Sequence, residues 1–137
     1  MFNYHDLGHM GIDRVQMNKA VFAALKPGGM YVIADHSGRA GTGISESGTL
    51  HRIEEAFLRK EVEAAGFKLV AEGNFMRNPA DPRDRNTPDP PQPKDEFVLK
   101  FVEHFFWIAA AVDPVGDQPD ELWDEEDGVF YDVLRRP

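Results

Sequence analysis

The stretch Leu25-Lys26-Pro27-Gly28-Gly29-Met30-Tyr31-Val32-Ile33-Ala34 decides the fold of this 137-residue chain. A helical pattern begins at Asp13 and ends at Pro27, because proline cannot continue a helix and the glycines after it accept positive φ. The apolar run of residues 30–34 lies between these glycines and the polar Asp35-His36-Ser37-Gly38, which is typical of a buried strand in a parallel sheet. A helix that leads directly into such a strand predicts an α/β fold, a sheet with helices on its faces.

The pattern continues over the following residues. Residues 1–4 resemble the end of a strand, a second helix is expected from about Thr49 to Ala65, and residues 67–72 alternate like a strand with one wetter face. Residues 77–95 hold most of the ten prolines and many charges, which favours a long loop too polar to pack. Residues 96–102 predict a last strand.

The C-terminal stretch differs in composition from what precedes it. Residues 104–112 are aromatic and apolar, and residues 113–127 contain eight carboxylates and no basic residue. We therefore predict two parts, a half-domain of residues 1–103 and a tail of residues 104–137. The run Phe105-Phe106-Trp107-Ile108 in this tail is more typical of a core or an interface than of a ligand site.

Composition excludes several classes of protein. The formal net charge of -9 disfavours binding to nucleic acid or to an anionic membrane surface, since both need clustered Lys and Arg. There is no cysteine, so disulfides and thiolate metal sites are excluded. No apolar run reaches the length of a membrane span, and residues 1–10 lack the basic start of a signal peptide. We therefore expect a cytoplasmic protein.

The segment Leu25-Lys26-Pro27-Gly28-Gly29 resembles the "LKPGG" segment that leads into the fifth strand of class I S-adenosylmethionine-dependent methyltransferases. Residues 61–67, ending Ala65-Gly66-Phe67, resemble the "AGF" turn that enters the sixth strand of that family. The family's last strand is antiparallel and lies between strands five and six, and residues 97–101 would supply it. The resemblance implies that residues 1–103 form the C-terminal half of a Rossmann-like class I methyltransferase sheet.

Other segments resemble one bacterial group of predicted methyltransferases, namely Tyr4-His5-Asp6-Leu7, Asp35-His36 and Leu50-His51-Arg52-Ile53. The resemblance implies S-adenosyl-L-methionine as cofactor and methyl transfer to a small molecule. The glycine-rich turn and ribose-binding acid of the family are missing from residues 1–137, so we expect weak or no cofactor binding and no activity by this chain alone. A missing N-terminal half or a second copy of the chain is the expected partner. The alternative is a non-enzymatic, self-associating half-fold.

Candidate site residues follow two neighbouring strand ends. Ligands of open α/β sheets bind beyond the carboxyl ends of the strands, and neighbouring strands lie about 5 Å apart. A base there could take the proton of a methyl acceptor. The predicted catalytic residues are His5, Asp6, Asp35 and His36. The predicted cofactor-binding residues are Asn3 and Tyr4.

Other interpretations of these residues stay open. The two aspartates could cap turns, with solvated imidazoles beside them. Two histidines with carboxylates could also bind a metal ion, and a small metal-dependent enzyme at His5, Asp6 and His36 is a third class. The i, i+4 histidine pair of a helical zinc motif is absent, so the sequence assigns no metal ligand. We expect His51-Arg52 to open the second helix on a solvated face, and the alternative is that this pair faces the same crevice as His5 and His36.

Overall fold

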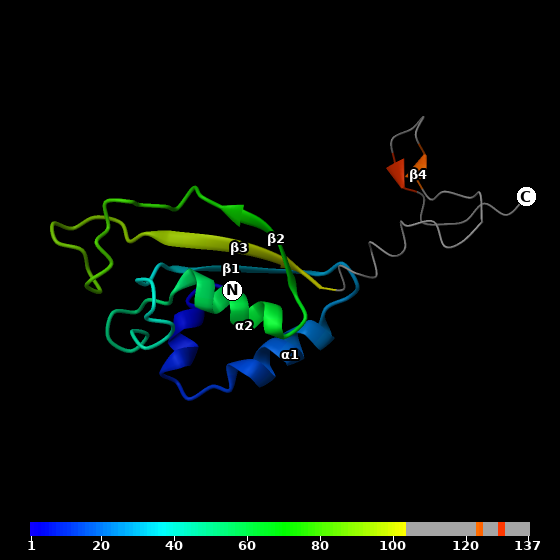
Figure 1. Ribbon diagram of the computed structural model, residues 1–137, viewed down its shortest axis with the longest axis horizontal. Helices are drawn as coiled ribbons and strands as arrows, with labels where there is room; N and C mark the ends of the chain where they lie inside the picture. Colours follow the sequence, from blue (N-terminus) through cyan, green and yellow to red (C-terminus); the bar gives the residue numbers. More distant parts are fainter. Residues whose placement is uncertain (104–122, 125–128, 131–137) are drawn as a thin grey trace, which may run out of the picture.

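A computed structural model describes residues 1–103, 123–124 and 129–130 of the chain (Figure 1). Its first 103 residues form a small α/β fold with a three-stranded sheet in the order β1-β3-β2. Strand β3 (Glu96–Val102) lies between β1 (Met30–His36) and β2 (Lys68–Gly73) and is antiparallel to both. The position expected for the last strand is therefore confirmed. The expectation that β1 belongs to a parallel sheet is wrong for its pairing with β3.

Residues 1–3 lie along the other edge of β1. Phe2 forms an isolated parallel bridge with Ala34, the Met1 amine donates to the Val32 carbonyl at 2.6 Å, and the Ala34 amide donates to the Met1 carbonyl at 2.9 Å. The chain then turns into the 3-10 helix η1 (Tyr4–Gly8). The expected neighbour of β1 is thus present as a single bridge at Phe2. The expectation that residues 1–4 form a strand end is wrong for Tyr4, which belongs to η1.

The two α-helices begin and end for identifiable reasons. Helix α1 (Arg14–Ala24) is capped by the Asp13 carboxylate, which accepts from the Gln16 amide, and the chain leaves it through Pro27 and Gly28, whose φ is 78°. Helix α2 (Glu55–Ala64) begins six residues later than the expected Thr49. The expected start is wrong because residues 43–50 form turns and Ile53 makes a parallel bridge with Ser37, which keeps Ile53 out of a helix.

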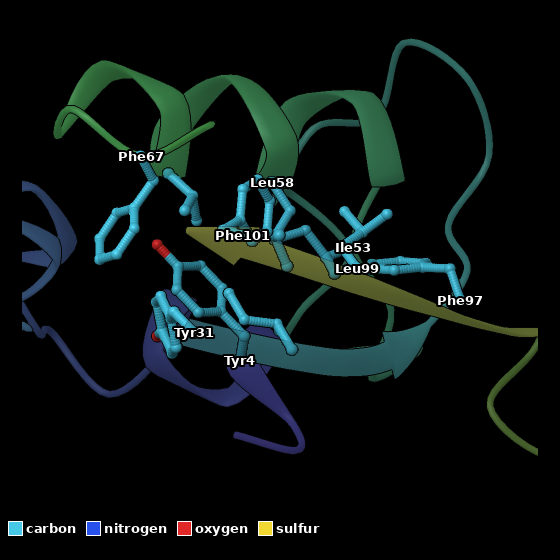
Figure 2. Packing of buried hydrophobic residues seen from close by; sticks show 10 residues of the cluster. Tyr4, Tyr31, Ile53, Leu58, Phe67, Phe97, Leu99 and Phe101 are labelled. Atoms are coloured by element: carbon cyan, nitrogen blue, oxygen red, sulfur yellow. The ribbon is translucent and has the colours of Figure 1, made fainter. Parts of the chain in front are cut away.

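Both helices cover one face of the sheet, and the core lies between them and β1 and β3 (Figures 1 and 2). Burial alternates along β1 and β3 because side chains of a strand point to opposite faces. The largest members of the core are Tyr4, Tyr31, Ile33, Ile53, Leu58, Phe67, Phe97, Leu99 and Phe101. In the described residues the second face of β1 is uncovered, with Met30 55% and Val32 43% exposed. The expectation of helices on both faces and a fully buried β1 is thus wrong for this part of the chain.

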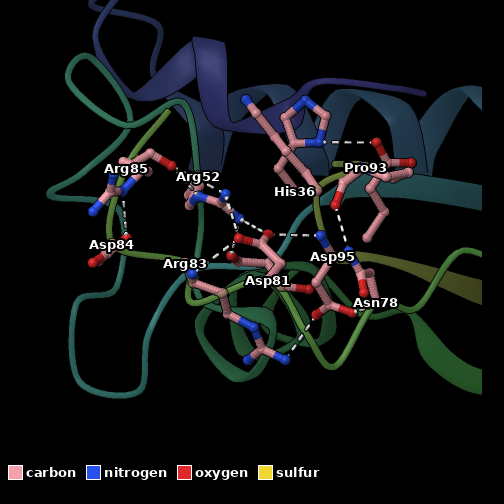
Figure 3. Close-up of polar contacts among 12 residues, drawn as sticks. His36, Arg52, Asn78, Asp81, Arg83, Asp84, Arg85, Pro93 and Asp95 are labelled. Carbon is pink, nitrogen blue, oxygen red and sulfur yellow. Dashed lines mark hydrogen bonds and ion pairs between the residues drawn. The ribbon is translucent and has the colours of Figure 1, made fainter. Parts of the chain in front are cut away.

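The proline-rich segment 74–95 packs around a buried ion pair, so the expectation of a loop too polar to pack is wrong (Figure 3). Arg52 donates to both carboxylate oxygens of Asp81, at 2.8 and 3.1 Å, and to the Ser37 carbonyl at 3.0 Å. Asp81 also accepts from the backbone amides of Arg83 and Asp95. The buried carboxylate of Asp81 is therefore bonded to Arg52 and to two backbone amides, and these bonds fasten the segment to the end of β1.

No helix among the described residues is long and apolar enough to cross a membrane. Two short antiparallel strands, β4 (Trp123–Asp124) and β5 (Val129–Phe130), are described in the C-terminal part. The predictions made for the rest of the tail, including Phe105-Phe106-Trp107-Ile108, lie outside the described residues.

The Arg52–Asp81 pair generates a stability prediction. Replacing Asp81 by Asn leaves the guanidinium of Arg52 buried without its counter-charge, which costs about 3–5 kcal/mol of unfolding free energy. Urea unfolding of Asp81→Asn against the unchanged chain measures this loss. Asp84→Asn is the matched control, since Asp84 is an exposed aspartate of the same segment. Equal stability of the two variants would contradict the role of the pair.

Candidate functional site

Asp35, at the carboxyl end of β1, is the centre of the candidate site. Its side chain is fully buried and its carboxylate accepts three hydrogen bonds. The donors are the His5 amide at 2.7 Å, the His36 amide at 2.7 Å and Nδ1 of His5 at 2.5 Å. A buried carboxylate needs such donors, so the proton of the His5 ring lies on Nδ1. The other ring nitrogen of His5, Nε2, is left with its lone pair facing outward.

The His5 lone pair faces a second carboxylate. Nε2 of His5 lies 3.1 Å from Oδ1 of Asp6, and Nδ1 of His51 lies 3.4 Å from the same oxygen. His5 is buried, while Asp6 and His51 are 36% and 40% exposed. Asp35, His5 and Asp6 therefore form a series that leads from the interior to the surface, with His51 beside its outer end.

Close packing of η1 against the segment 44–51 brings these groups together. A Cβ at Gly8 would lie 2.4 Å from Cγ1 of Ile44 and 2.8 Å from Oγ of Ser47, so only glycine permits this approach. His51 has the left-handed backbone conformation, with φ of 51°, which turns the chain toward η1. The site thus depends on contacts between segments that are far apart in the sequence.

Four of the five histidines of the chain lie in a row. The ring of His5 is 5.5 Å from that of His36 and 5.6 Å from that of His51, and the ring of His9 is 5.8 Å from that of His51. Imidazoles can act as proton acceptors and as metal ligands. The four rings therefore make the edge of the sheet where β1 ends the candidate functional site.

His36 has a different environment from His5. Burial and the nearby charge of Lys94 lower the pKa of His36 to about 4. Nδ1 of His36 lies 3.0 Å from Oε1 of Glu96, without the geometry of a hydrogen bond. Burial and the charge of Asp35 raise the pKa of Glu96. Both shifts favour the neutral forms, so this contact is not a strong ion pair at neutral pH.

The structure brings the four predicted catalytic residues together, and their role stays a prediction. The two predicted cofactor-binding residues, Asn3 and Tyr4, differ in their exposure to solvent. Tyr4 is fully buried in the core, and its hydroxyl accepts from Asn18 at 2.7 Å and lies 3.1 Å from Glu61, which leaves it no exposed atom for a ligand. Asn3 is partly exposed and has a buried Oδ1 without a hydrogen-bond partner.

The expectation of a solvated helix face for His51 and Arg52 is wrong, because both precede α2 and Arg52 is fully buried against Asp81. The alternative, that the pair faces the crevice, holds for His51, which lies at the candidate site. His9, at the end of the histidine row, was not singled out. No spacing rule connects residues 5, 9, 36 and 51; the only available indication was the number of histidines flanking predicted strand and helix ends.

Comparison of the chain with protein-family models, with curated proteins and with solved structures gives no match. The resemblance to class I methyltransferases therefore stays a prediction. What the candidate site can do follows from its own geometry: a buried acid, a histidine oriented by it, and an exposed carboxylate in front.

The environment of His36 predicts a loss of stability in acid. The unfolded chain has the ordinary pKa of 6.5 and the folded protein one of about 4, so the unfolded state binds the proton first as the pH falls, and stability decreases. Between about pH 7 and pH 5 this costs about 2 kcal/mol, measurable by urea unfolding at both values. His36→Gln removes this part of the pH dependence and retains the opposing part from Glu96. An unchanged slope in the variant would contradict the prediction.

Proposed function

We propose that the chain is the acceptor-side half of a class I methyltransferase, in which Asp6, His5 and Asp35 remove the proton of a small-molecule methyl acceptor. The observation that carries this proposal is the series of contacts from exposed Asp6 through His5 to buried Asp35. It lies at the carboxyl end of β1, where ligands of open α/β sheets bind.

The strand arrangement supports the methyltransferase part of the proposal. The order β1-β3-β2, with β3 antiparallel between the others, is the order that strands five, seven and six have in the class I fold. The parallel bridge between Phe2 and Ala34 puts residues 1–3 where strand four would lie. This agreement concerns the fold alone, and the reaction is inferred from the site.

The proposed chemistry moves one proton inward. A hydroxyl or amine of the acceptor loses its proton to Asp6, the exposed member, and Asp6 passes it to Nε2 of His5 at 3.1 Å. The imidazolium that forms is stabilised by the Asp35 carboxylate at 2.5 Å, which is buried and carries no other cation. S-adenosylmethionine would supply the methyl group. The product proton leaves through Asp6 to solvent.

The residues that the structure describes do not complete a cofactor site. Tyr4 is committed to the core, and Asn3 offers a single unpaired buried oxygen. No cofactor-dependent step is therefore assigned to residues of this chain. The remaining cofactor contacts would come from a partner half, which we place along the free edge of residues 1–3.

Methyl transfer tests the proposal directly. The reading frame upstream of Met1 is expected to encode a strand followed by a glycine-rich turn, and the longer protein is expected to transfer tritium from methyl-labelled S-adenosylmethionine to a fraction of a small-molecule extract. Asp6→Asn should lower this rate by about 10² or more, as loss of an acid–base group does. Circular dichroism should show a retained fold.

The control is Asp84→Asn, whose exposed carboxylate lies outside the candidate site and pairs with Arg85. It should retain the full rate. A loss of less than about tenfold in Asp6→Asn would exclude the proton-transfer role. An upstream frame without the glycine-rich turn would contradict the proposed partner half.

A second candidate function is self-association without catalysis, and the uncovered sheet face favours it. Among the described residues, Phe2, Met30 and Val32 are 49%, 55% and 43% exposed and lie on adjacent segments. Contiguous apolar surface of this kind marks an interaction site. A second copy of the chain could bury the same face about a two-fold axis.

Sedimentation equilibrium across a dilution series tests this candidate. We expect a mass above that of the 15.4 kDa chain at high concentration, because pairing removes the apolar face from water. Val32→Lys should return the mass to that of one chain. Val15→Lys is the matched control, since Val15 is also an exposed valine, at 56% against 43% for Val32, and lies on α1. A concentration-independent mass of one chain would refute the candidate.

A further inference from the structure

Three potential metal ligands come together where His5 and His51 meet Asp6. Each of His5, Asp6 and His51 offers one ligand atom, and these atoms lie within 4.8 Å of one another. We propose that this cluster binds a divalent transition-metal cation of the zinc type. The inference goes beyond the proposed function and does not depend on methyl transfer.

The distances agree with a tetrahedral metal site. Ligand atoms bound about 2.0 Å from a tetrahedral zinc ion lie about 3.3 Å from each other. The distance from Nε2 of His5 to Oδ1 of Asp6 is 3.1 Å, and that from Oδ1 of Asp6 to Nδ1 of His51 is 3.4 Å. These two pairs of ligand atoms therefore need little movement to bind one cation, and the remaining pair, from His5 to His51, lies within 4.8 Å.

The hydrogen bonding of His5 makes a positive charge at this point favourable. Since Nδ1 of His5 donates to Asp35, a neutral His5 presents only a lone pair to Asp6. Two acceptors that face each other at 3.1 Å repel unless a proton or a cation lies between them. A metal-binding histidine commonly donates its other N–H to a carboxylate, which is the part that Asp35 has here.

The ligand types select the cation. Two imidazole nitrogens and one carboxylate suit Zn²⁺, Co²⁺ or Ni²⁺, whereas Mg²⁺ and Ca²⁺ prefer oxygen ligands alone. Three protein ligands leave the fourth position open for water or for a ligand. The sequence alone assigned no metal ligand, because the i, i+4 histidine pair of a helical zinc motif is absent. The third ligand, His51, is 45 residues from Asp6 and was not counted in the possible metal site.

A cation and a proton compete for the same lone pair of His5. The loaded site therefore cannot use His5 to accept the proton of a methyl acceptor, and added Zn²⁺ should inhibit any transfer that depends on it. Zinc binding and methyl transfer are measured separately, so failure of one proposal leaves the other open to its own test.

The test is a Zn²⁺ titration of the full chain in competition with a chromophoric chelator. We expect one equivalent bound with a dissociation constant in the micromolar range or below, and no comparable binding of Mg²⁺. His51→Ala and Asp6→Asn should each weaken binding at least tenfold. Asp35→Asn should weaken it about 10–100-fold, as loss of a carboxylate behind a ligating histidine does. Asp84→Asn should bind as the unchanged chain does.

Nuclear magnetic resonance of the unchanged chain tests the site even if Asp35→Asn or Asp6→Asn fails to fold. Zn²⁺ should shift the ring-proton resonances of His5 and His51 in the nuclear magnetic resonance spectrum of the unchanged chain. His51→Ala, which removes a partly exposed side chain outside the core, decides the affinity. Full affinity in His51→Ala, or shifts that leave out His5, would overturn the proposed site.

Discussion

The buried carboxylate of Asp35 is the interaction on which the rest of the site depends. It follows the largely apolar residues 30–34 of β1 and is fully buried, where an uncompensated charge would cost several kcal/mol. Compensation comes from His5 and His36, through two backbone amides and one ring nitrogen. These bonds pin η1 to β1 and fix which nitrogen of His5 carries the proton. One buried charge thus sets both the local fold and the chemistry in front of it.

The second buried charge system stabilises the same end of the sheet from the other side. Arg52 links Ser37, just after β1, to Asp81 in the proline-rich segment. Asp81 also accepts from the amide of Asp95, which directly precedes β3. His51 directly precedes Arg52, so the ion pair also holds the backbone that presents the His51 ring to Asp6. The long polar segment is therefore part of the support of the candidate site, and the charge of its Lys94 acts on His36.

The sequence predicts the elements that rest on local chemistry and misses those that rest on distant partners. Helix α1 follows from its cap at Asp13 and its end before Pro27, and β1 and β3 follow from their apolar residues. The strand order agrees with the expected arrangement. The start of α2 and the packing of residues 74–95 depend on Ile53 and Asp81 meeting partners far along the chain. For the site, adjacent strand ends predict that His5 and Asp35 converge. The approach of His51 depends on a left-handed turn and a close contact at Gly8, which no periodicity reveals.

The direction of charge along the site follows from these supports. Asp35 is buried and accepts hydrogen bonds from the amides of His5 and His36 and from the His5 ring. Of these donors, the His5 ring is the group that can carry a positive charge. His5 transmits this balance, because a positive charge at Nε2 is stabilised by Asp35 behind it and by Asp6 in front. The net charge of -9 adds a long-range attraction for cations. The arrangement therefore favours a positively charged species at Nε2 of His5. This species is either a proton taken from the methyl acceptor or a metal ion. The two exclude each other, because only the deprotonated nitrogen can bind a metal.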